Sequence, residues 1–453
     1  MNKKKIEPYK KLLRFLAMMI VVIAVTLIFV MFWRDNYNEG IVFPFYYKGH
    51  WLVGAFYAFF FLTFSHIYGG MSYGYLKNTN IIFSQILALL CTNIVIYLEI
   101  VLLSARFVKV VPMFELTVIE AAFLSISTCI IDRLFKTLFP PHKITVLYQE
   151  YDPSELLRKV KTRKDRYRIQ ETVDVNREWD ELVCIIDKCE SILVYDVHSE
   201  LRNKIVKYCY EKDIRLYVTP KISDILIRSS DNIHLFDTPL MLLRNNGLNF
   251  EQRIMKRLLD VIVSLIVIIV TSPIMAIIAL AIKLYDGGPV FFKQKRCTLD
   301  GKVFEIHKFR SMIVDAEKEG ISIPATDKDP RITPVGNVIR MTRLDELPQV
   351  FDILIGNMSI VGPRPERVEH VEKYTKEVPE FAYRLKVKGG LTGYAQIYGK
   401  YNTTPYDKLK LDLMYIQNYS ILLDLKLILM TVKIIFMKES TEGFKEGDKM
   451  KDE

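Results

Sequence analysis

The sequence predicts a membrane protein of mixed α and α/β structure. Half of its 453 residues are hydrophobic, and a mean hydropathy of +0.15 is high for a soluble protein. Long apolar stretches occupy the first third of the chain, and beyond residue 140 short β-branched runs alternate with charged segments. We therefore expect a four-helix transmembrane bundle at 1–140, a small α/β domain at 141–243, and a mainly helical domain at 244–453.

Four apolar stretches in the first part predict transmembrane helices. Each is about long enough to cross the roughly 30 Å of hydrocarbon in a bilayer. The first is too long and too aromatic for a signal-peptide core and precedes no small-residue cleavage site, so we expect it to be retained. The stretches are 15–33, 51–68, 81–103 and 111–131.

Lysine and arginine predict the orientation of this bundle. Basic residues lie before the first stretch and after the fourth, which places both ends in the cytoplasm. Three acidic residues lie in or beside the stretches, and we expect them to pair between helices or to lie at the membrane interface. The basic residues are Lys3, Lys4, Lys5, Lys10, Lys11, Arg133, Lys136 and Lys143, and the acidic ones are Glu99, Glu115 and Glu120.

The second part predicts alternating strands and helices. Segments 144–148, 154–164, 190–197, 200–212 and 214–220 have the composition of strand, helix, strand, helix and strand. This order is typical of a doubly wound, Rossmann-like domain. The first strand is followed by Gln149, Glu150, Tyr151 and Asp152, whereas a dinucleotide site needs glycines there. We therefore expect a spacer, oligomerisation or regulatory domain, and the bundle and this domain offer surfaces for a homodimer.

The third part begins with a second membrane signal. Residues 258–282 are as long as a spanning helix, but basic residues lie on both sides, and both flanks therefore favour the cytoplasm. Pro273 removes a backbone hydrogen bond and bends a helix, and the hydroxyl of Ser272 can satisfy the freed carbonyl. Two interpretations stay open: a kinked re-entrant helix over about 256–284, or a fifth spanning helix.

The net charge of +10 does not indicate a nucleic-acid partner, because no basic run is interleaved with aromatic residues. Anionic lipid and a phosphorylated substrate explain the charge better. The six cysteines lack CxxC or histidine spacing, so neither a zinc site nor a disulfide framework is predicted.

An acidic pair, Asp345 and Glu346, lies between arginine-bearing turns. The apolar spacing at 347, 350, 351 and 354 predicts a short helix that ends at Gly356, with Asp345 near its N-cap. The N-terminus of that helix would favour an ionised Asp345 and attract phosphate oxygens. The alternative is an ordinary capping aspartate followed by a first-turn glutamate.

Several motifs then follow in a fixed order: KRLLD, the Ser-Pro kink, GGPVFFKQKR, FEIHKFRSM, LDELPQ, VGPRPE and GLTGYAQ. On these motifs, residues 242–436 resemble the bacterial sugar transferase family, which comprises monotopic polyprenyl-phosphate phosphoglycosyl transferases. With four spans and an α/β domain ahead of this region, the whole chain resembles the long form of the family. The missing glycine turn puts a nucleotide role for the α/β domain in doubt.

The resemblance implies transfer of a sugar-1-phosphate from a UDP-sugar to undecaprenyl phosphate, with release of UMP and a need for Mg²⁺. The expected place is the cytoplasmic face of the bacterial inner membrane. The expected role is the first step of exopolysaccharide, capsule or O-antigen assembly, which supplies downstream glycosyltransferases. A non-enzymatic membrane scaffold or sensor is the alternative hypothesis.

The resemblance also assigns roles to residues. Asp345 would be the nucleophile and would form a covalent phosphosugar intermediate. Glu346, together with Asp345, would hold Mg²⁺, which prefers oxygen ligands. Basic side chains would gather the phosphates, and these are Lys308, Arg310, Arg340, Arg343 and Arg364. Asp412 matches a family aspartate near the active site, and a helix-surface charge is the open alternative.

Three further segments carry expectations of their own. His307 is expected to be a packed strand residue rather than a base. Residues 421–437 carry too much charge for a comfortable span and suit a helix in the membrane interface. Gly389, Gly390 and Gly393 lack the lysine and helix of a P-loop and are expected to be turn glycines.

Overall fold

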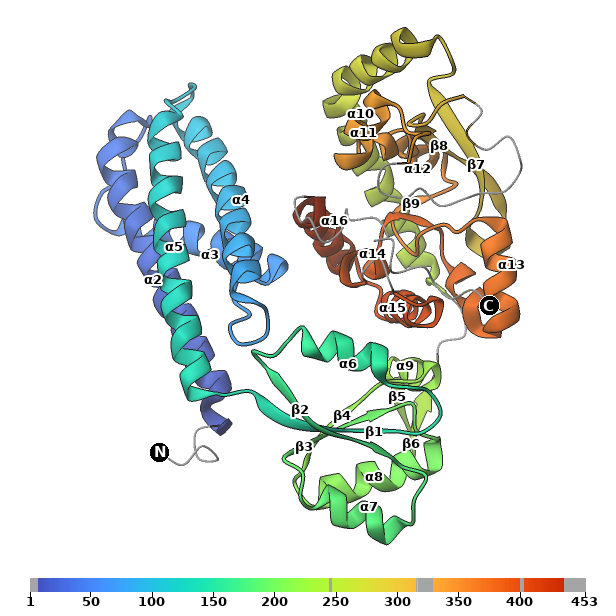
Figure 1. Cartoon of the computed structure of the whole chain (residues 1–453). Coiled ribbons are helices and arrows are strands. Elements are labelled where there is room, and N and C mark those ends of the chain that lie inside the picture. Colours follow the sequence, from blue (N-terminus) through green and yellow to red (C-terminus); the bar gives the residue numbers. More distant parts are fainter. Residues whose placement is uncertain (1–6, 244–246, 315, 317–328, 400–402, 436–453) are drawn as a thin grey trace. The chain divides into compact units, whose positions relative to one another are not determined.

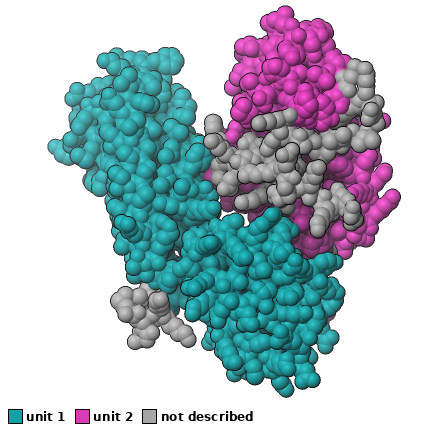
Figure 2. All heavy atoms as spheres, viewed as in Figure 1, with its two compact units in different colours: residues 1–219 teal, residues 220–453 magenta. Residues whose placement is uncertain are grey.

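The computed structural model describes residues 7–243, 247–314, 316, 329–399 and 403–435. The chain forms two compact units, Met1–Thr219 and Pro220–Glu453 (Figure 2). The predicted domain boundaries at 140 and 243 stay predictions. Lys3, Lys4, Lys5 and the last two positions of the predicted helix 421–437 lie outside the described residues.

Each of the four apolar stretches forms one helix of the first unit (Figure 1). All four helices are long and apolar enough to cross a membrane, which agrees with a membrane protein. Glu120 is fully buried among them, and its carboxylate accepts hydrogen bonds from Tyr57 Oη at 2.8 Å and Asn93 Nδ2 at 3.2 Å. This acid therefore links three helices through neutral donors. The helices are α2 (Lys10–Asn36), α3 (Lys48–Tyr68), α4 (Asn78–Ser104) and α5 (Val111–Leu138).

The rest of the first unit is a four-stranded parallel sheet in the order β2-β1-β3-β4. Helix α6 covers one face, and α7 and α8 cover the other (Figure 1). The sequence patterns missed β2 and α7. Strand β2 is an edge strand with one buried side chain, and Glu171 interrupts its apolar alternation. The elements are β1 (His142–Tyr148), α6 (Ser154–Lys161), β2 (Tyr167–Asp174), α7 (Trp179–Ile186), β3 (Ser191–Tyr195), α8 (Ser199–Glu211) and β4 (Arg215–Val218).

The second unit is mainly helical with three two-stranded sheets. Strands β9 and β10 run parallel and lie very close together, since a Cβ atom on Gly390 would be 2.1 Å from the amide nitrogen of Gly362. The elements before the acidic pair are α9 (Ile222–Arg228), β5 (Asp231–Leu235), β6 (Thr238–Leu242), α10 (Phe250–Asp286), β7 (Phe291–Cys297), β8 (Val303–Phe309) and α11 (Pro334–Met341). Those from the pair onward are η4 (Leu344–Glu346), α12 (Gln349–Ile355), β9 (Ser359–Val361), α13 (Val368–Glu377), η5 (Pro379–Lys386), β10 (Gly390–Thr392), α14 (Tyr394–Tyr398), α15 (Pro405–Gln417) and α16 (Ile421–Ile435).

The N-terminal part of α10 is bound into the core of this unit. Lys256 Nζ donates to Asp424 Oδ2 of α16 at 2.6 Å. The Arg257 guanidinium donates to the last carbonyls of α12 at 2.7 and 2.6 Å. Asp260 accepts hydrogen bonds from β9 at 2.9 Å, one from a serine hydroxyl and one from a backbone amide. The charged residues of the KRLLD motif thus fix the start of α10 to three neighbouring elements.

The remainder of α10 presents apolar side chains outward, including Ile269, Val270 and Ile277. The whole helix has 37 residues and is about 55 Å long, more than the roughly 30 Å of hydrocarbon in a bilayer. Pro273 leaves the carbonyl of Ile269 without its helical donor, and Ser272 Oγ donates to that carbonyl at 3.1 Å. The re-entrant path itself stays a prediction.

Candidate active site

The acidic pair lies in a short 3₁₀ turn, η4, directly before α12. Arg343 enters this turn in the left-handed conformation, with φ of 60°. Pro348 is the N-cap of α12, because its fixed φ suits the start of a helix. The predicted capping position of Asp345 is therefore wrong, since this residue lies one turn earlier.

The apolar face predicted for the helix is also partly wrong. Val350 and Ile353 are buried, but Phe351 is 42% exposed. Two polar side chains on α12, Gln349 and Asp352, are buried instead. Asp352 Oδ1 lies 2.7 Å from His307 Nδ1 on β8, so His307 packs against α12, as expected of a strand residue.

Glu346 is held by two cations from different segments. Its Oε1 accepts hydrogen bonds from Lys308 Nζ of β8 and from Arg364 Nη2, both at 2.8 Å. Burial acts to raise the pKa of Glu346, but Arg364 and Lys308 outweigh it and hold that pKa well below its usual range. Burial lowers the pKa of Lys308, and Glu346 opposes this effect. Glu346 is therefore an ionised, fixed carboxylate.

Asp345 differs from its neighbour in having free oxygens. Its carboxylate makes no hydrogen bond to any residue that the structure describes. Burial raises the pKa of Asp345, the charge of Lys308 opposes that rise, and Glu346 adds to it. The surroundings of Asp345 therefore do not favour its ionised form, although a position at a helix N-terminus was predicted to do so.

Two more of the predicted cations act on Asp345. Arg340 lies on α11 and Arg343 opens η4, and both charges lower the pKa of Asp345. The structure thus brings Lys308, Arg340, Arg343 and Arg364 to the acidic pair, from four segments of the chain.

Arg310 lies outside this group, and its predicted phosphate binding stays a prediction. Its guanidinium pairs with Asp286 at the end of α10 and donates through Nε to the Pro289 carbonyl at 2.7 Å. The side chain is 6% exposed. Since β8 ends at Phe309, Arg310 does not continue the side of the strand that carries Lys308. Its fork is used to fix the loop after α10.

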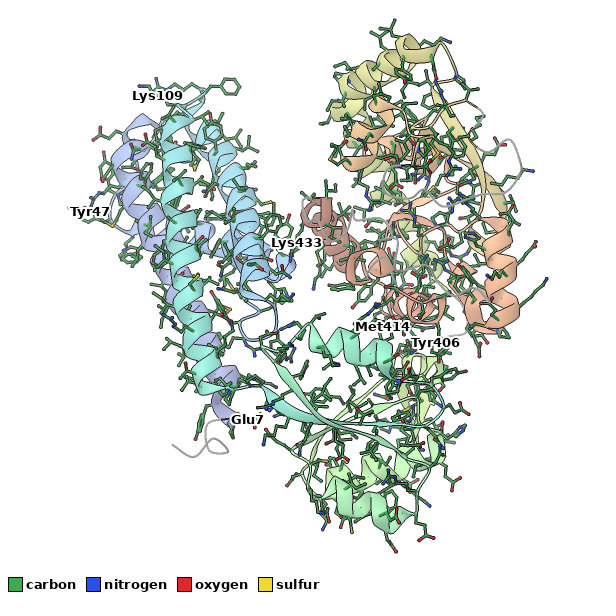
Figure 3. All side chains as sticks on the ribbon, in the orientation of Figure 1. Glu7, Tyr47, Lys109, Tyr406, Met414 and Lys433 are labelled. Atoms are coloured by element: carbon green, nitrogen blue, oxygen red, sulfur yellow. The ribbon has the colours of Figure 1, made fainter. Side chains whose placement is uncertain are left out.

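Of the two interpretations of Asp412, the helix-surface charge is wrong because the residue is buried, and the position near the active site stays a prediction. Asp412 lies on α15, the helix on which Figure 3 labels Tyr406 and Met414, and is 1% exposed. Its Oδ2 pairs with Arg384 Nη2 at 2.8 Å. Burial raises the pKa of Asp412, and Arg384 opposes that rise.

Arg384 connects Asp412 to the segment that carries Arg364. Its Nη2 donates to the Arg364 carbonyl at 2.9 Å, and its Nη1 lies 3.5 Å from Glu366 Oε1. Lys408 Nζ also donates to Glu366. Burial acts to raise the pKa of Glu366, but His370, Lys408 and Arg384 hold it well below its usual range. We call Glu366, Arg384, Lys408 and Asp412 the bracing cluster.

The other side of the same segment is held by Arg296 on β7. Its Nη1 donates to the Pro365 carbonyl at 3.1 Å, and burial lowers its pKa to about 10. The sequence did not predict supporting roles for Arg296, Glu366, Arg384 and Lys408. Glu366 lies in the motif VGPRPE and Arg296 in the motif GGPVFFKQKR. Their places in these motifs were the sequence feature that could have indicated a supporting role.

The acidic pair fits the predicted magnesium by its chemistry. Mg²⁺ is typically bound by one or two carboxylates together with substrate phosphates and water. The carboxylate oxygens of Asp345 make no hydrogen bond with a described residue, and Glu346, the next residue in the chain, supplies a second carboxylate. No group of three or more metal-ligating side chains occurs in the described part of the chain.

Comparison with known proteins assigns the second unit. Residues 251–438 match the sequence model of the family described as bacterial sugar transferase. This range contains α10 apart from its first residue, Phe250, and includes the acidic pair and the bracing cluster.

Three relatives illustrate the similarity. A UDP-glucose:undecaprenyl-phosphate glucose-1-phosphate transferase of Klebsiella pneumoniae is 40% identical over 256 residues, 55% of this chain and 53% of the relative. A UDP-N-acetylgalactosamine-undecaprenyl-phosphate N-acetylgalactosaminephosphotransferase of Aeromonas hydrophila is 37% identical over 230 residues, 50% of this chain and 53% of the relative. The uncharacterized sugar transferase EpsL of Bacillus subtilis is 38% identical over 189 residues, 42% of this chain and 91% of the relative. The chain thus spans about half the length of the first two relatives and nearly all of the third.

Proposed function

The chain belongs to the bacterial sugar transferase family, and from this premise we propose that it transfers a sugar-1-phosphate from a UDP-sugar to undecaprenyl phosphate. The names of its relatives support this reaction class. The observation that carries the proposal is the contrast within the acidic pair. Glu346 is fixed by two cations, whereas Asp345 beside it has a carboxylate that no described residue engages.

A reaction in two steps follows from this arrangement. A carboxylate oxygen of Asp345 attacks the sugar-linked phosphorus of the donor, the bond to the bridging oxygen breaks, and UMP leaves. A phosphate oxygen of undecaprenyl phosphate then attacks the same phosphorus. The acyl phosphate bond breaks, Asp345 is regenerated, and the product is undecaprenyl-diphosphate-sugar. Covalent catalysis of this kind divides one difficult displacement into two easier ones.

The cations around the pair have separate tasks in this proposal. Arg340 and Arg343 act on Asp345 and would receive the donor phosphates, because a guanidinium fork matches phosphate oxygens. Lys308 and Arg364 hold Glu346 and add positive charge beside the phosphorus. Asp345 and Glu346 would hold Mg²⁺, which when bound neutralises charge on the diphosphate and stabilises the leaving UMP.

The membrane position of the site follows from α10. The start of this helix is bound to α12, β9 and α16, and its remaining surface is apolar and exposed. We propose that α10 enters and leaves the cytoplasmic leaflet of the bacterial inner membrane, so that the acidic pair lies at the surface where a polyprenyl phosphate presents its head group.

The nucleophile is tested with the purified full chain and its Asp345→Asn variant. UMP release is measured with undecaprenyl phosphate and a panel of UDP-glucose, UDP-galactose and UDP-N-acetylgalactosamine, because the relatives are named for these sugars. Asp300→Asn, at an exposed turn, is the matched control. We expect turnover only with Asp345 present, and a phosphosugar adduct on this residue by mass spectrometry. Normal turnover by Asp345→Asn would show that Asp345 is not the nucleophile. If the unmodified chain released no UMP from any of the donors, the scaffold hypothesis would be favoured.

The path of α10 is tested by cysteine labelling in intact cells. Cysteines replace Glu251, an exposed residue in the first turn of α10, and Lys293, an exposed residue after the helix. The exposed Cys129 and Cys184 are removed from the background. A re-entrant helix protects both positions from an impermeant reagent. Labelling of position 293 from outside would instead establish a fifth spanning helix.

A further inference from the structure

A cluster of cations lies in the first unit, where the helix bundle joins the α/β domain. Glu7, labelled in Figure 3, precedes α2 at this end of the bundle. Cationic side chains outnumber acidic ones here, and they come from both the bundle and the α/β domain. The cations are Lys10, Arg14, Lys136, Arg163, Arg166 and Arg215, and the acids are Glu7, Asp132 and Asp165.

Each of these acids already has a cationic partner. Asp132 pairs with Lys136 at 2.5 Å, and Asp165 pairs with Arg163 at 3.0 Å. Glu7 pairs with Arg215 and lies 3.5 Å from His142. Lys10, Arg14 and Arg166 are therefore left without a carboxylate partner among the residues that the structure describes.

These three cations converge on a small area. The guanidinium carbons of Arg14 and Arg166 lie 4.1 and 4.4 Å from the ring centre of Tyr75, in the loop between α3 and α4. Lys10 and Arg166 line a pocket together with Phe139 and His142. A side-chain hydrogen bond from Arg14 lowers the pKa of Tyr75 against the effect of burial, and the charges of Arg14, Arg166 and Lys10 add to this lowering. The positive field at Tyr75 thus has three sources.

The guanidinium group of Arg14 has buried N–H groups that lack an acceptor among the described residues. Its Nε and Nη2 are buried and have no hydrogen-bond acceptor in the described structure. A buried donor without an acceptor costs free energy, and a charged one costs more. Stacking on Tyr75 does not satisfy these N–H groups. An anion with several oxygens would satisfy them and would also relieve the repulsion between neighbouring cations.

We propose that Lys10, Arg14 and Arg166 form a binding site for a phosphate-bearing anion at the junction of the helix bundle and the α/β domain. A phosphate group matches the guanidinium fork, and basic pockets beside membrane helices bind anionic lipid head groups. The same chemistry is offered by a lipid phosphate and by free phosphate. Because Arg14 belongs to α2 and Arg166 directly precedes β2, the occupant fastens the α/β domain to the bundle. This inference does not depend on the proposed transferase reaction.

The test uses the purified full chain in lipid nanodiscs. One arm compares phosphatidylcholine with an equal mixture of phosphatidylcholine and phosphatidylglycerol, and the other adds inorganic phosphate to phosphatidylcholine nanodiscs against chloride at equal ionic strength. The readouts are the thermal unfolding midpoint and the number of bound anions by native mass spectrometry. The double variant Arg14→Gln, Arg166→Gln should bind about 25-fold more weakly, since each charge is worth about fivefold in affinity.

Lys11→Gln is the matched control, because Lys11 adjoins Lys10 on the same helix and is exposed. If phosphatidylglycerol raises the unfolding midpoint and the number of bound anions, the occupant of the site is a lipid head group. If inorganic phosphate raises them, the occupant is free phosphate. Either gain supports the site if the double variant loses it and Lys11→Gln keeps it. If the double variant does not fold, Arg166→Gln alone is compared in the same way. No gain with either probe, or an equal loss in Lys11→Gln, overturns the proposal.

Discussion

Two carboxylate clusters of the second unit have nearly the same composition but different bonding. The first consists of Asp345, Glu346, Lys308 and Arg364. The second is the bracing cluster of Glu366, Arg384, Lys408 and Asp412. In each cluster one glutamate is held by two cations, and its pKa lies well below the usual range although burial acts to raise it. In each cluster burial raises the pKa of the aspartate.

The difference between the clusters is the partner of the aspartate. Asp412 forms an ion pair with Arg384 at 2.8 Å, although neither of its oxygens accepts a hydrogen bond in the described structure. Asp345 makes neither an ion pair nor a hydrogen bond with any described residue. Charges inside proteins are normally paired, and the half-buried, unpaired carboxylate of Asp345 is therefore the one to which we assign the reaction with the donor. The direction of the pKa shift is the same for both aspartates and does not separate them.

The largest expected effect is the loss of activity in Asp345→Asn without a loss of stability. Removing a nucleophile should lower turnover at least about 1,000-fold. The free energy of unfolding should stay the same or rise, because the variant no longer holds an unpaired carboxylate that is half-buried. Turnover assays and thermal unfolding in the same detergent measure the two quantities. A lower melting temperature in this variant would mean that Asp345 is a structural partner like Asp412.

The opposite result is expected for Asp412→Asn. The variant leaves the buried guanidinium of Arg384, which is 2% exposed, with Glu366 at 3.5 Å as its remaining carboxylate contact. Breaking a buried ion pair typically costs about 3 kcal/mol, so the midpoint of thermal unfolding should fall clearly. Asp407→Asn, on the same helix but with a more exposed carboxylate, is the control. A stable but inactive Asp412→Asn variant would place this residue in the catalytic site.

The sequence predicted the acidic pair and most of its cations because these residues stand in a series of short motifs. Lys308, Arg340, Arg343 and Arg364 could be named in this way, and all four act near the pair. The ion pair of Arg310 with Asp286 was not predicted, because the motif does not show that β8 ends one residue earlier. The role of Asp412 could not be predicted, since its partner Arg384 lies in another segment and only the tertiary structure brings the two together.

The fold shows the same limit. The four long helices and the start of α10 follow from apolar length and flanking charge, which are local properties. Strand β2 was missed because its burial depends on its edge position in the sheet, and only one of its side chains is buried. The capping prediction for Asp345 failed because Pro348 shifted the start of α12 by one turn.

A smaller effect is expected for Arg384→Lys. Lysine keeps the charge opposite Asp412, but it lacks the fork that also donates to the Arg364 carbonyl. The segment carrying Arg364 should then be less well positioned, and kcat should fall about tenfold, since small displacements of positioning groups are costly. The Michaelis constants should change little. An equal tenfold loss in Lys386→Gln, which lies two residues further along and outside the cluster, would show that the effect is not specific to Arg384.

The smallest expected effect is a shift in the pH profile of Lys308→Gln. Burial raises the pKa of Asp345, and the charge of Lys308 is the main opposing influence, so its removal should raise that pKa further. A carboxylate nucleophile must be ionised, and activity is therefore lost as the pH falls through its pKa. The acidic limb of kcat/KM should consequently move to higher pH in Lys308→Gln, in addition to any loss of rate. Lys302→Gln, at an exposed turn before β8, should leave the limb in place. A limb that stays fixed or moves to lower pH would show that the charge of Lys308 acts on Glu346 alone.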